Sequence, residues 1–285
     1  MKTKVITLAS GSSGNCFILV NNQGAILIDA GGKQLSFKRL KAKLAREDLE
    51  LKDIKGILVT HVHGDHFGRA AVLACSKEKV PLFVENDRET WGIVRAGFGR
   101  RGGGAVSLRH KHMIRQFHLN RKFKVGGFYV KAFRVPHNMP CVGFSIYDGD
   151  DKKVTLVYDF NLPLQREMDR LIYNLADSEL LIVESNYDNG LIIASSIDTT
   201  NDSNHIENAR INHMSNFDTA KLVLNVIDAG WGNPRKVILA HVSKKHNRRS
   251  LAKSIIQDGI RRAGTRILVY VAPRLEDNRP LRLSI

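Results

Sequence analysis

The sequence has few cysteines and no long apolar run. Cys16, Cys75 and Cys141 are odd in number, far apart and without C-x-x-C spacing, which argues against a disulfide framework and against a cysteine-based zinc site. Such cysteine usage favours the reducing cytoplasm. No apolar stretch approaches the roughly 18–20 residues that a membrane helix needs, and the first ten residues are too polar for a signal peptide. We therefore expect a cytoplasmic protein that does not associate with membranes.

Acidic residues are also scarce. The chain has 44 Lys and Arg against 28 Asp and Glu, a formal charge of +16, and no acidic residue lies between Thr90 and Tyr147. A basic excess of this size favours a polyanionic partner such as nucleic acid. Charge alone is equally compatible with an ordinary solvated surface, so it does not decide the partner.

The length of 285 residues and the 43% hydrophobic content suit one layered α/β domain, residues 1–285, with no inserted substrate domain. Short apolar runs bounded by turn residues predict strands in both halves of the chain, and helical patterns fall between them. We expect strands at 5–8, 16–20, 25–28, 56–60, 80–84, 128–135, 142–147, 154–158, 180–184, 237–240 and 266–271. Helices are expected at 35–44, 67–77, 164–175, 216–227 and 249–262. This order predicts sheets packed face to face under outer helices.

Two stretches predict loops instead. Gly97–Gly104 is glycine-rich and basic and should form a mobile loop. Asp188–Asn204 is rich in Ser, Thr, Asn and Asp and is expected to be a polar loop or insertion.

The most informative segment is Thr60-His61-Val62-His63-Gly64-Asp65-His66, between an expected strand and an expected helix. Alternate side chains of an extended segment share a face, so His61 and His63 can bind one ion. Gly64 allows the chain to turn, after which Asp65 and His66 point elsewhere. Three imidazoles and a carboxylate within six residues suit zinc or a similar divalent metal.

The same residues resemble the metallo-β-lactamase superfamily, whose hallmark is H-x-H-x-D-H after a hydrophobic strand. That family adds an early aspartate, a later histidine, a bridging aspartate and a final histidine. Asp29, His137, Asp159 and His241 stand in those places, each after an apolar run, and in that order. The resemblance covers nearly the whole chain and implies a four-layer αββα sandwich with two mixed sheets face to face.

Four further motifs are similar to the YycJ/WalJ branch of that superfamily. They are Ser10-Gly-Ser-Ser-Gly-Asn15, Glu184-Ser-Asn-Tyr-Asp188, His213-Met-Ser-Asn216 and His241-Val-Ser-Lys-Lys-His-Asn247. Members of that branch are cytoplasmic and have been described as DNA exonucleases. This chain departs from their pattern at Asn212, at Tyr158-Asp159-Phe160-Asn161, where the branch has Thr-Asp-x-Gly, and at His246.

The resemblance implies two divalent metals, zinc or manganese. His61, His63 and His137 would hold one, Asp65, His66 and His241 the other, and Asp159 would bridge them. Asp65 could also orient the attacking hydroxide, and Asp29 would support the histidine loop by hydrogen bonds without binding metal. His213, which precedes a helix start, could bind or protonate a phosphate oxygen.

Charge placement then bears on the substrate. Lys244, Lys245, Arg248 and Arg249 follow His241 closely, and Arg134 precedes His137. Cationic side chains beside the metals suit a phosphodiester polymer. We therefore expect a metal-dependent nuclease in which a hydroxide held by two metals attacks phosphorus. From the resemblance, DNA rather than RNA is the expected polymer, and action from the 5′ end the expected mode. A small-molecule hydrolase of a cyclic phosphodiester, lactone or thioester stays open as the alternative.

Overall fold

The computed structural model describes residues 2–97, 112–197, 203–277 and 279–285. The described chain divides into two compact units, Met1–Ala132 with Pro273–Ile285, and Phe133–Ala272. The dividing point lies within a strand, β8 (Phe128–Val135). The predicted loop at 97–104 lies, from residue 98 onwards, outside the described residues.

The first unit carries a mixed sheet of seven strands in the order β14-β1-β2-β3-β4-β5-β6. The neighbours from β14 to β3 are antiparallel, and those from β3 to β6 are parallel. The strands are β1 (Lys4–Ala9), β2 (Cys16–Asn21), β3 (Gly24–Ile28), β4 (Ile54–Leu58), β5 (Leu82–Glu85), β6 (Ile114–Phe117) and β14 (Leu281–Ser284).

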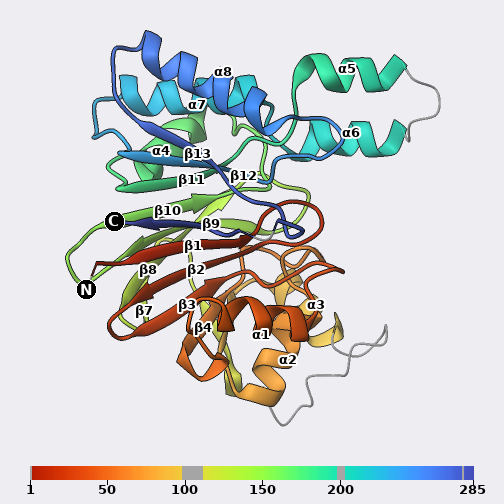
Figure 1. The fold of residues 1–285 in the computed structure, drawn as a ribbon, viewed down its shortest axis with the longest axis vertical. Coiled ribbons are helices and arrows are strands. Elements are labelled where there is room, and N and C mark those ends of the chain that lie inside the picture. The colour runs from red at the N-terminus through yellow and green to blue at the C-terminus, as the bar shows by residue number, and fades with distance from the viewer. Residues whose placement is uncertain (1, 98–111, 198–202, 278) are drawn as a thin grey trace. The chain divides into compact units, whose positions relative to one another are not determined.

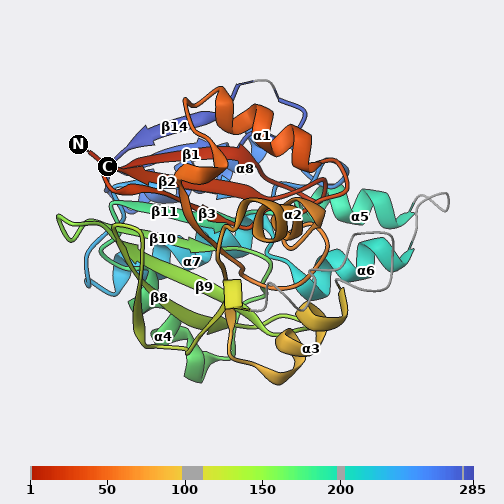
Figure 2. The ribbon, with the colours of Figure 1, turned by 90° about the horizontal axis from the view of Figure 1, so that it is seen from below.

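Helices of the first unit form the crossovers that parallel strands require. They are α1 (Phe37–Ala45) and the short 3-10 helix η1 (Leu51–Asp53), α2 (Arg69–Glu78) and α3 (Arg88–Gly97), which follow β3, β4 and β5 respectively. Figures 1 and 2 both show α1 and α2 side by side. The parallel strands β3, β4 and β5 are almost wholly buried, which explains their nearly continuous apolar sequence.

The second seven-stranded sheet has the order β13-β12-β11-β10-β9-β8-β7 and is parallel from β10 to β13. Its remaining strands are β7 (Lys122–Val125), β9 (Cys141–Tyr147), β10 (Lys153–Val157), β11 (Leu180–Glu184), β12 (Lys236–Ala240) and β13 (Leu268–Val271). Its crossover helices are α4 (Gln165–Leu175), α5 (Asn189–Ile197), α6 (Ser203–Asn212), α7 (Asn216–Asp228) and α8 (Arg249–Arg262). The prediction of two mixed sheets accompanied by helices is confirmed.

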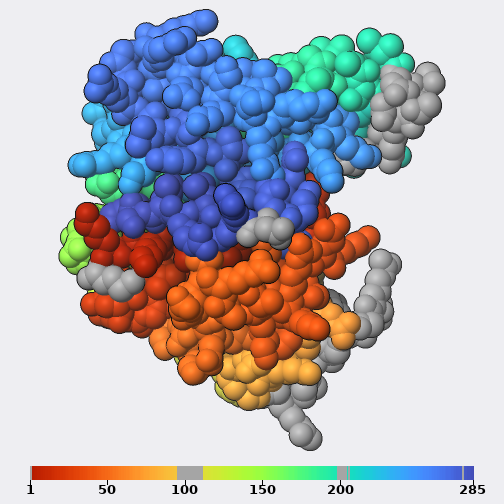
Figure 3. All heavy atoms as spheres, in the orientation of Figure 1, coloured from red at the N-terminus to blue at the C-terminus, as the bar shows by residue number. Residues whose placement is uncertain are grey.

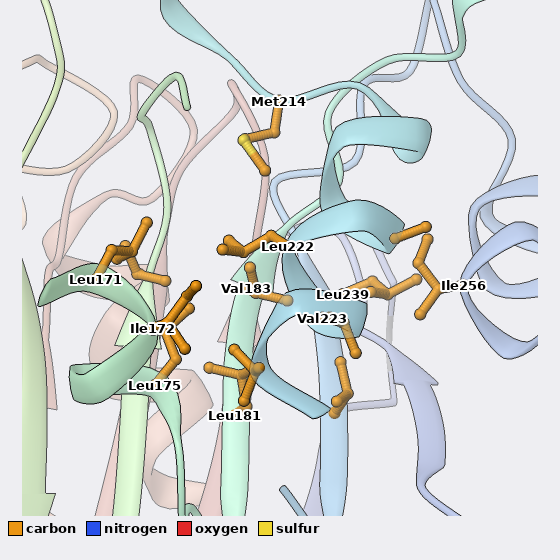
Figure 4. Packing of buried hydrophobic residues seen from close by; sticks show 14 of the residues in the cluster. Leu171, Ile172, Leu175, Leu181, Val183, Met214, Leu222, Val223, Leu239 and Ile256 are labelled. Atoms are coloured by element: carbon orange, nitrogen blue, oxygen red, sulfur yellow. The ribbon is translucent and has the colours of Figure 1, made fainter. Parts of the chain in front are cut away.

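A continuous apolar core joins this sheet to its helices. Leu181 and Val183 of β11 and Leu239 of β12 pack against residues of α4, α7 and α8, among them Leu222 and Ile256 (Figure 4). Because the neighbouring parallel strands are anchored on the same helices, their carboxyl ends are held in a fixed register. Those ends carry the polar residues described below.

Local signals at α7 act as expected. Ser215 caps the helix, since its hydroxyl accepts the Asp218 amide, and the Asp218 side chain accepts the Ser215 amide in return. Gly230 follows the helix with φ of 69°.

The predicted loop at 188–204 is wrong for most of its length. Residues 189–197 form α5, and α6 begins at Ser203. The Asp188 side chain caps α5 by accepting the amides of Gly190 and Leu191, and Ile192 packs with Tyr187, Ile206 and Ala209. Capping and this small core stabilise α5, whose central residues 191–194, Leu-Ile-Ile-Ala, are apolar although the ends of the stretch are polar. Within the described residues, no helix combines the length and the apolar character that crossing a membrane requires.

Candidate metal centre

The histidine segment of the first unit forms a tight turn between β4 and α2. The amides of His66 and Phe67 both donate to the His63 carbonyl, at 3.0 and 2.8 Å. The side chains of His61 and His63 face each other, with Nε2 of His61 3.1 Å from Nδ1 of His63. Two ring nitrogens at this separation can hold one cation between them.

Asp29, directly after β3, orients this segment. Its fully buried carboxylate accepts the Thr60 amide (2.9 Å), the Thr60 hydroxyl (2.8 Å) and Nδ1 of His66 (2.7 Å). Because the Thr60 hydroxyl donates to Asp29, Nδ1 of His61, 3.1 Å from that hydroxyl, must be its donor. Both imidazoles therefore carry their proton on Nδ1 and present Nε2 as the metal-binding nitrogen.

Asp65 and His66 make a second pair of donors. Nε2 of His66 lies 3.5 Å from Asp65 Oδ2 and accepts from Nδ2 of Asn15 at 2.9 Å, which fits a lone pair on Nε2. The first unit thus brings together all four predicted ligands of the motif, as two pairs of donors.

Neighbouring loops hold the backbone of this segment in place. The amides of Asn15, Ala30 and Gly32 donate to the carbonyls of Asp65, His66 and Gly64, at 2.9, 3.0 and 2.7 Å. Gly31 lies so close that a Cβ on it would collide with the backbone of Asp65 and His66. The missing side chain allows the two loops to touch.

Three buried residues of the second unit lie at the carboxyl ends of adjacent parallel strands. Glu184 is the last residue of β11, and Asp159 and His241 lie just beyond β10 and β12. Asp159 and His241 have φ of 55° and 51°, and Asp29 in the first unit has 57°. Such left-handed backbone is uncommon outside glycine and is enriched at functional sites.

These strand ends form a compact cluster with His213. Nδ1 of His241 lies 3.1 Å from Asp159 Oδ1 and 3.2 Å from Glu184 Oε1. Nδ1 of His213 lies 2.6 Å from the same Glu184 oxygen. The four residues offer ligand atoms that lie within 4.8 Å of one another, and His137 has one within 4.8 Å of Asp159. Asp159 is therefore within reach of both predicted histidine ligands of this unit, which suits a bridging carboxylate.

The Glu184–His213 pair carries opposite charges. Burial by itself raises the pKa of the Glu184 carboxyl, but the charge and hydrogen bond of His213 outweigh burial and lower it. Burial likewise lowers the pKa of His213, yet the Glu184 carboxylate reverses this and raises it. Each group holds the other in its charged form.

Sequence reasoning missed Glu184 and three asparagines as site residues. Asn186 donates from Nδ2 to the His241 carbonyl (2.9 Å), and Asn247 donates to the Asn186 carbonyl (3.0 Å) and to Asn216 (2.8 Å). These buried amides fix the chain that carries His241. Their only signal lay in the motifs around residues 184–188, 213–216 and 241–247.

Of the predicted substrate-binding residues, Arg134, Lys244, Lys245 and Arg248 are exposed and Arg249 is half-buried. Arg134 is on β8, Arg248 caps the start of α8, and Arg249 is the first residue of α8.

Comparison with known proteins identifies the family. The family model described as metallo-beta-lactamase superfamily matches residues 9–152. The chain belongs to the metallo-beta-lactamase superfamily. It is a metal-dependent hydrolase, as the sequence predicted.

Relatives in this superfamily match most of the chain. Exodeoxyribonuclease WalJ of Streptococcus pneumoniae is 28% identical over 250 residues, which are 87% of this chain and 85% of that protein. Exodeoxyribonuclease YycJ of Bacillus anthracis is 25% identical over 265 residues, 90% of this chain and 89% of that protein. Among solved structures, YhfI of Bacillus subtilis has a TM-score of 0.66 at 13% identity, with full coverage of both chains. It shows that the fold is shared.

The residues present fit the divalent metals that this superfamily implies. Imidazole nitrogens and carboxylate oxygens are the donors that zinc and manganese accept. Within each unit the donors already face one another, and hydrogen bonds to the Thr60 hydroxyl and to Asp29 set the tautomers of His61 and His66, respectively.

Replacing Gly31 by alanine should displace the segment that carries His61, His63, Asp65 and His66. The new methyl group meets backbone that cannot move aside, so we expect a loss of about 1–3 kcal/mol in unfolding free energy and a 10–100-fold weaker metal affinity. Urea unfolding and metal titration measure the two effects. Gly64→Ala is the matched control, because a Cβ at Gly64 meets nothing within 4 Å. Equal losses in both variants would contradict the role of Gly31.

Glu184→Gln should destabilise the metal-free protein in a pH-dependent way. The pKa of Glu184 is below its ordinary 4.5 when folded, so its contribution is complete above 4.5 and disappears as the pH falls through the lowered value. The pKa of His213 is above its ordinary 6.5, so its contribution is complete below 6.5 and disappears as the pH rises through the raised value. The deficit should therefore be largest between these values, at about 1.5–3 kcal/mol, and shrink at alkaline pH.

Urea unfolding with a chelator across this pH range measures the deficit. Glu179→Gln is the control, because Glu179 pairs with the exposed Arg235 (3.2 Å) and should contribute less than about 1 kcal/mol. A Glu184→Gln deficit that stays constant at alkaline pH would show that His213 is not charged.

Proposed function

We propose that this protein is a metal-dependent exonuclease that degrades DNA from the 5′ end. Two observations support this proposal. The chain is similar, over at least 85% of either sequence, to proteins named as exodeoxyribonucleases, and it has two clusters of metal donors at strand ends. The relatives' names favour a nuclease over the small-molecule hydrolase. The 5′ direction follows from the resemblance to the YycJ/WalJ branch.

We propose that both units form one catalytic domain and share its two metals. His61, His63 and His137 would hold one ion, Asp65, His66 and His241 the other, and Asp159 would bridge them. The paired donors in the first unit and the position of Asp159 between His137 and His241 support this division. When bound, two divalent cations, zinc or manganese, lower the pKa of water and neutralise charge that develops on the phosphate.

The remaining site residues would move and hold protons. Asp65 is partly exposed and can accept a hydrogen bond from the attacking water, which orients it. His213 is kept protonated by Glu184 through Nδ1, so its Nε2 can donate a hydrogen bond or a proton to a phosphate or leaving oxygen. Asp29 would act indirectly, by fixing His61 and His66.

The substrate assignment also uses charge. Lys244, Lys245, Arg248, Arg249 and Arg134 would contact the phosphate backbone, and this requires a polyanion. We propose DNA rather than RNA because of the relatives' names, and a cytoplasmic location because of the few, scattered cysteines.

The proposal is tested with end-labelled single- and double-stranded DNA and RNA, with zinc or manganese added. The wild-type protein should shorten DNA stepwise from its 5′ end. His63→Ala and Asp159→Ala should each reduce the rate by more than about a hundredfold, with the far-UV circular dichroism unchanged. His118→Ala is the control, since exposed His118 lies outside the predicted ligand set. Full activity of His63→Ala would refute the ligand assignment, and cleavage of RNA alone would refute the substrate.

A further inference from the structure

The second unit has a groove that none of the proposed site residues lines. It has a volume of about 590 Å³ and lies between α8 and β13. Its lining includes Lys253, Gln257 and Arg261 of α8, followed by Thr265, Arg266 and Leu268. Because β13 is the outermost strand of its sheet, this groove is bounded by the sheet edge. Figure 3 shows α8, coloured blue, on the surface of the molecule.

The groove follows a row of polar side chains along α8. Lys253, Gln257 and Arg261 are spaced by four residues, so they lie on one face of the helix. Each step of four residues advances about 6 Å along the axis. Lys253, Gln257 and Arg261 are exposed, whereas Ala252, Ile256 and Ile260 face the core. The row is therefore a solvent-facing track and not part of the packing.

The charge of this region is almost entirely positive. Residues 244–266 contain eight Lys and Arg and one acidic residue, Asp258. Asp258, which also lines the groove, pairs with Arg261 at 3.0 Å, but the two side chains are 46% and 78% exposed, so the pair is weak.

The neutral residues of the groove match the same kind of ligand. Ser250, Ser254, Gln257 and Thr265 add hydroxyl and amide donors beside the cations. Lys, Arg, Ser, Thr and Gln are the side chains that contact phosphate and sugar oxygens in nucleic-acid complexes.

This track starts next to the cluster of the second unit. Asn247, immediately before α8, is hydrogen-bonded to the backbone of Ser185 and Asn186, and Asn186 is bonded to His241. The start of α8 is thus tied to a predicted ligand. Basic residues at a helix C-terminus can simply stabilise the helix dipole. That explanation covers Arg261, but not Lys253 in mid-helix or Arg266 beyond the helix end.

We infer that the groove along α8 binds the sugar–phosphate backbone of the nucleic-acid strand that is being degraded, on the part of the strand outside the metal cluster. The inference rests on the proposed nuclease function and adds a path for the substrate. Its consequence is a length dependence: strands long enough to follow α8, about 21 Å, bind more tightly than dinucleotides.

The test compares Lys253→Gln/Arg261→Gln with a matched control, Arg166→Gln/Arg170→Gln. The control removes two exposed arginines, four residues apart, from α4 of the same unit. Glutamine keeps the helix propensity of both residues. Binding of a labelled single-stranded DNA that spans α8 is measured by fluorescence anisotropy, with all proteins in the inactive His63→Ala background. A dinucleotide competitor reports on the metal cluster alone, and thermal unfolding checks the fold.

The groove variant should lose affinity for the long strand and compete with the dinucleotide as the unmodified background does. Loss of two phosphate contacts makes the salt slope shallower by about 1.4, so the factor by which the background binds more tightly than the groove variant falls about sevenfold between 50 and 200 mM salt. Unchanged long-strand binding by the groove variant, or an equal loss in the control, would overturn the inference while leaving the nuclease proposal standing. Absence of nucleic-acid cleavage by the wild-type protein would overturn both.

Discussion

The buried carboxylate of Asp29 is the interaction on which the histidine motif depends. It lies directly after β3 and accepts hydrogen bonds from an amide, a hydroxyl and an imidazole of the segment between β4 and α2. A buried carboxylate is costly unless donors surround it, and here the donors are Thr60 and His66. The same bonds that satisfy the carboxylate decide which nitrogens of His61 and His66 are protonated. Secondary structure, burial and ligand chemistry are therefore linked at one residue.

The second unit also holds its candidate ligands in place by hydrogen bonds, but these involve different residues. Asp159 and His241 leave their strands in a left-handed conformation that costs on the order of 1–3 kcal/mol at each residue. The surrounding structure holds them there: Asn186 binds the His241 backbone, and Phe160 donates its amide to Glu184 at 3.1 Å. The apolar core beneath, from Leu181 to Ile256, keeps β10, β11 and β12 in register, so their ends meet. The packed apolar core thus keeps the strained residues Asp159 and His241 in position.

How much of the fold and of the candidate site could be predicted from the sequence depends on how far apart the interacting residues lie along the chain. The strands with continuous apolar runs, the helix at 216–227 and the histidine motif are local patterns, and each was predicted. Glu184 and His213 are 29 residues apart in the sequence, and Asn186 and Asn247 are 61 apart. No short stretch of sequence therefore shows that the members of either pair are in contact. Strand β14 pairs with β1 at the opposite end of the chain and has alternating partial exposure, which makes it resemble a tail. Helix α5 was missed because polar residues at both ends of the stretch obscured its apolar centre at 191–194, and its packing partners Ile206 and Ala209 lie further along the chain.

The close contact of the Gly31 loop with the histidine loop has a consequence for how the metals are acquired. Three backbone amides, from Asn15, Ala30 and Gly32, already hold the chain between Gly64 and His66. The loop has lost its conformational entropy through these bonds, so ligation has little disorder left to remove. Small zinc-finger domains, by contrast, fold only when the ion is bound. We therefore expect the ions and the fold of this protein to be thermodynamically separable: a chelator should remove the metals without unfolding the chain.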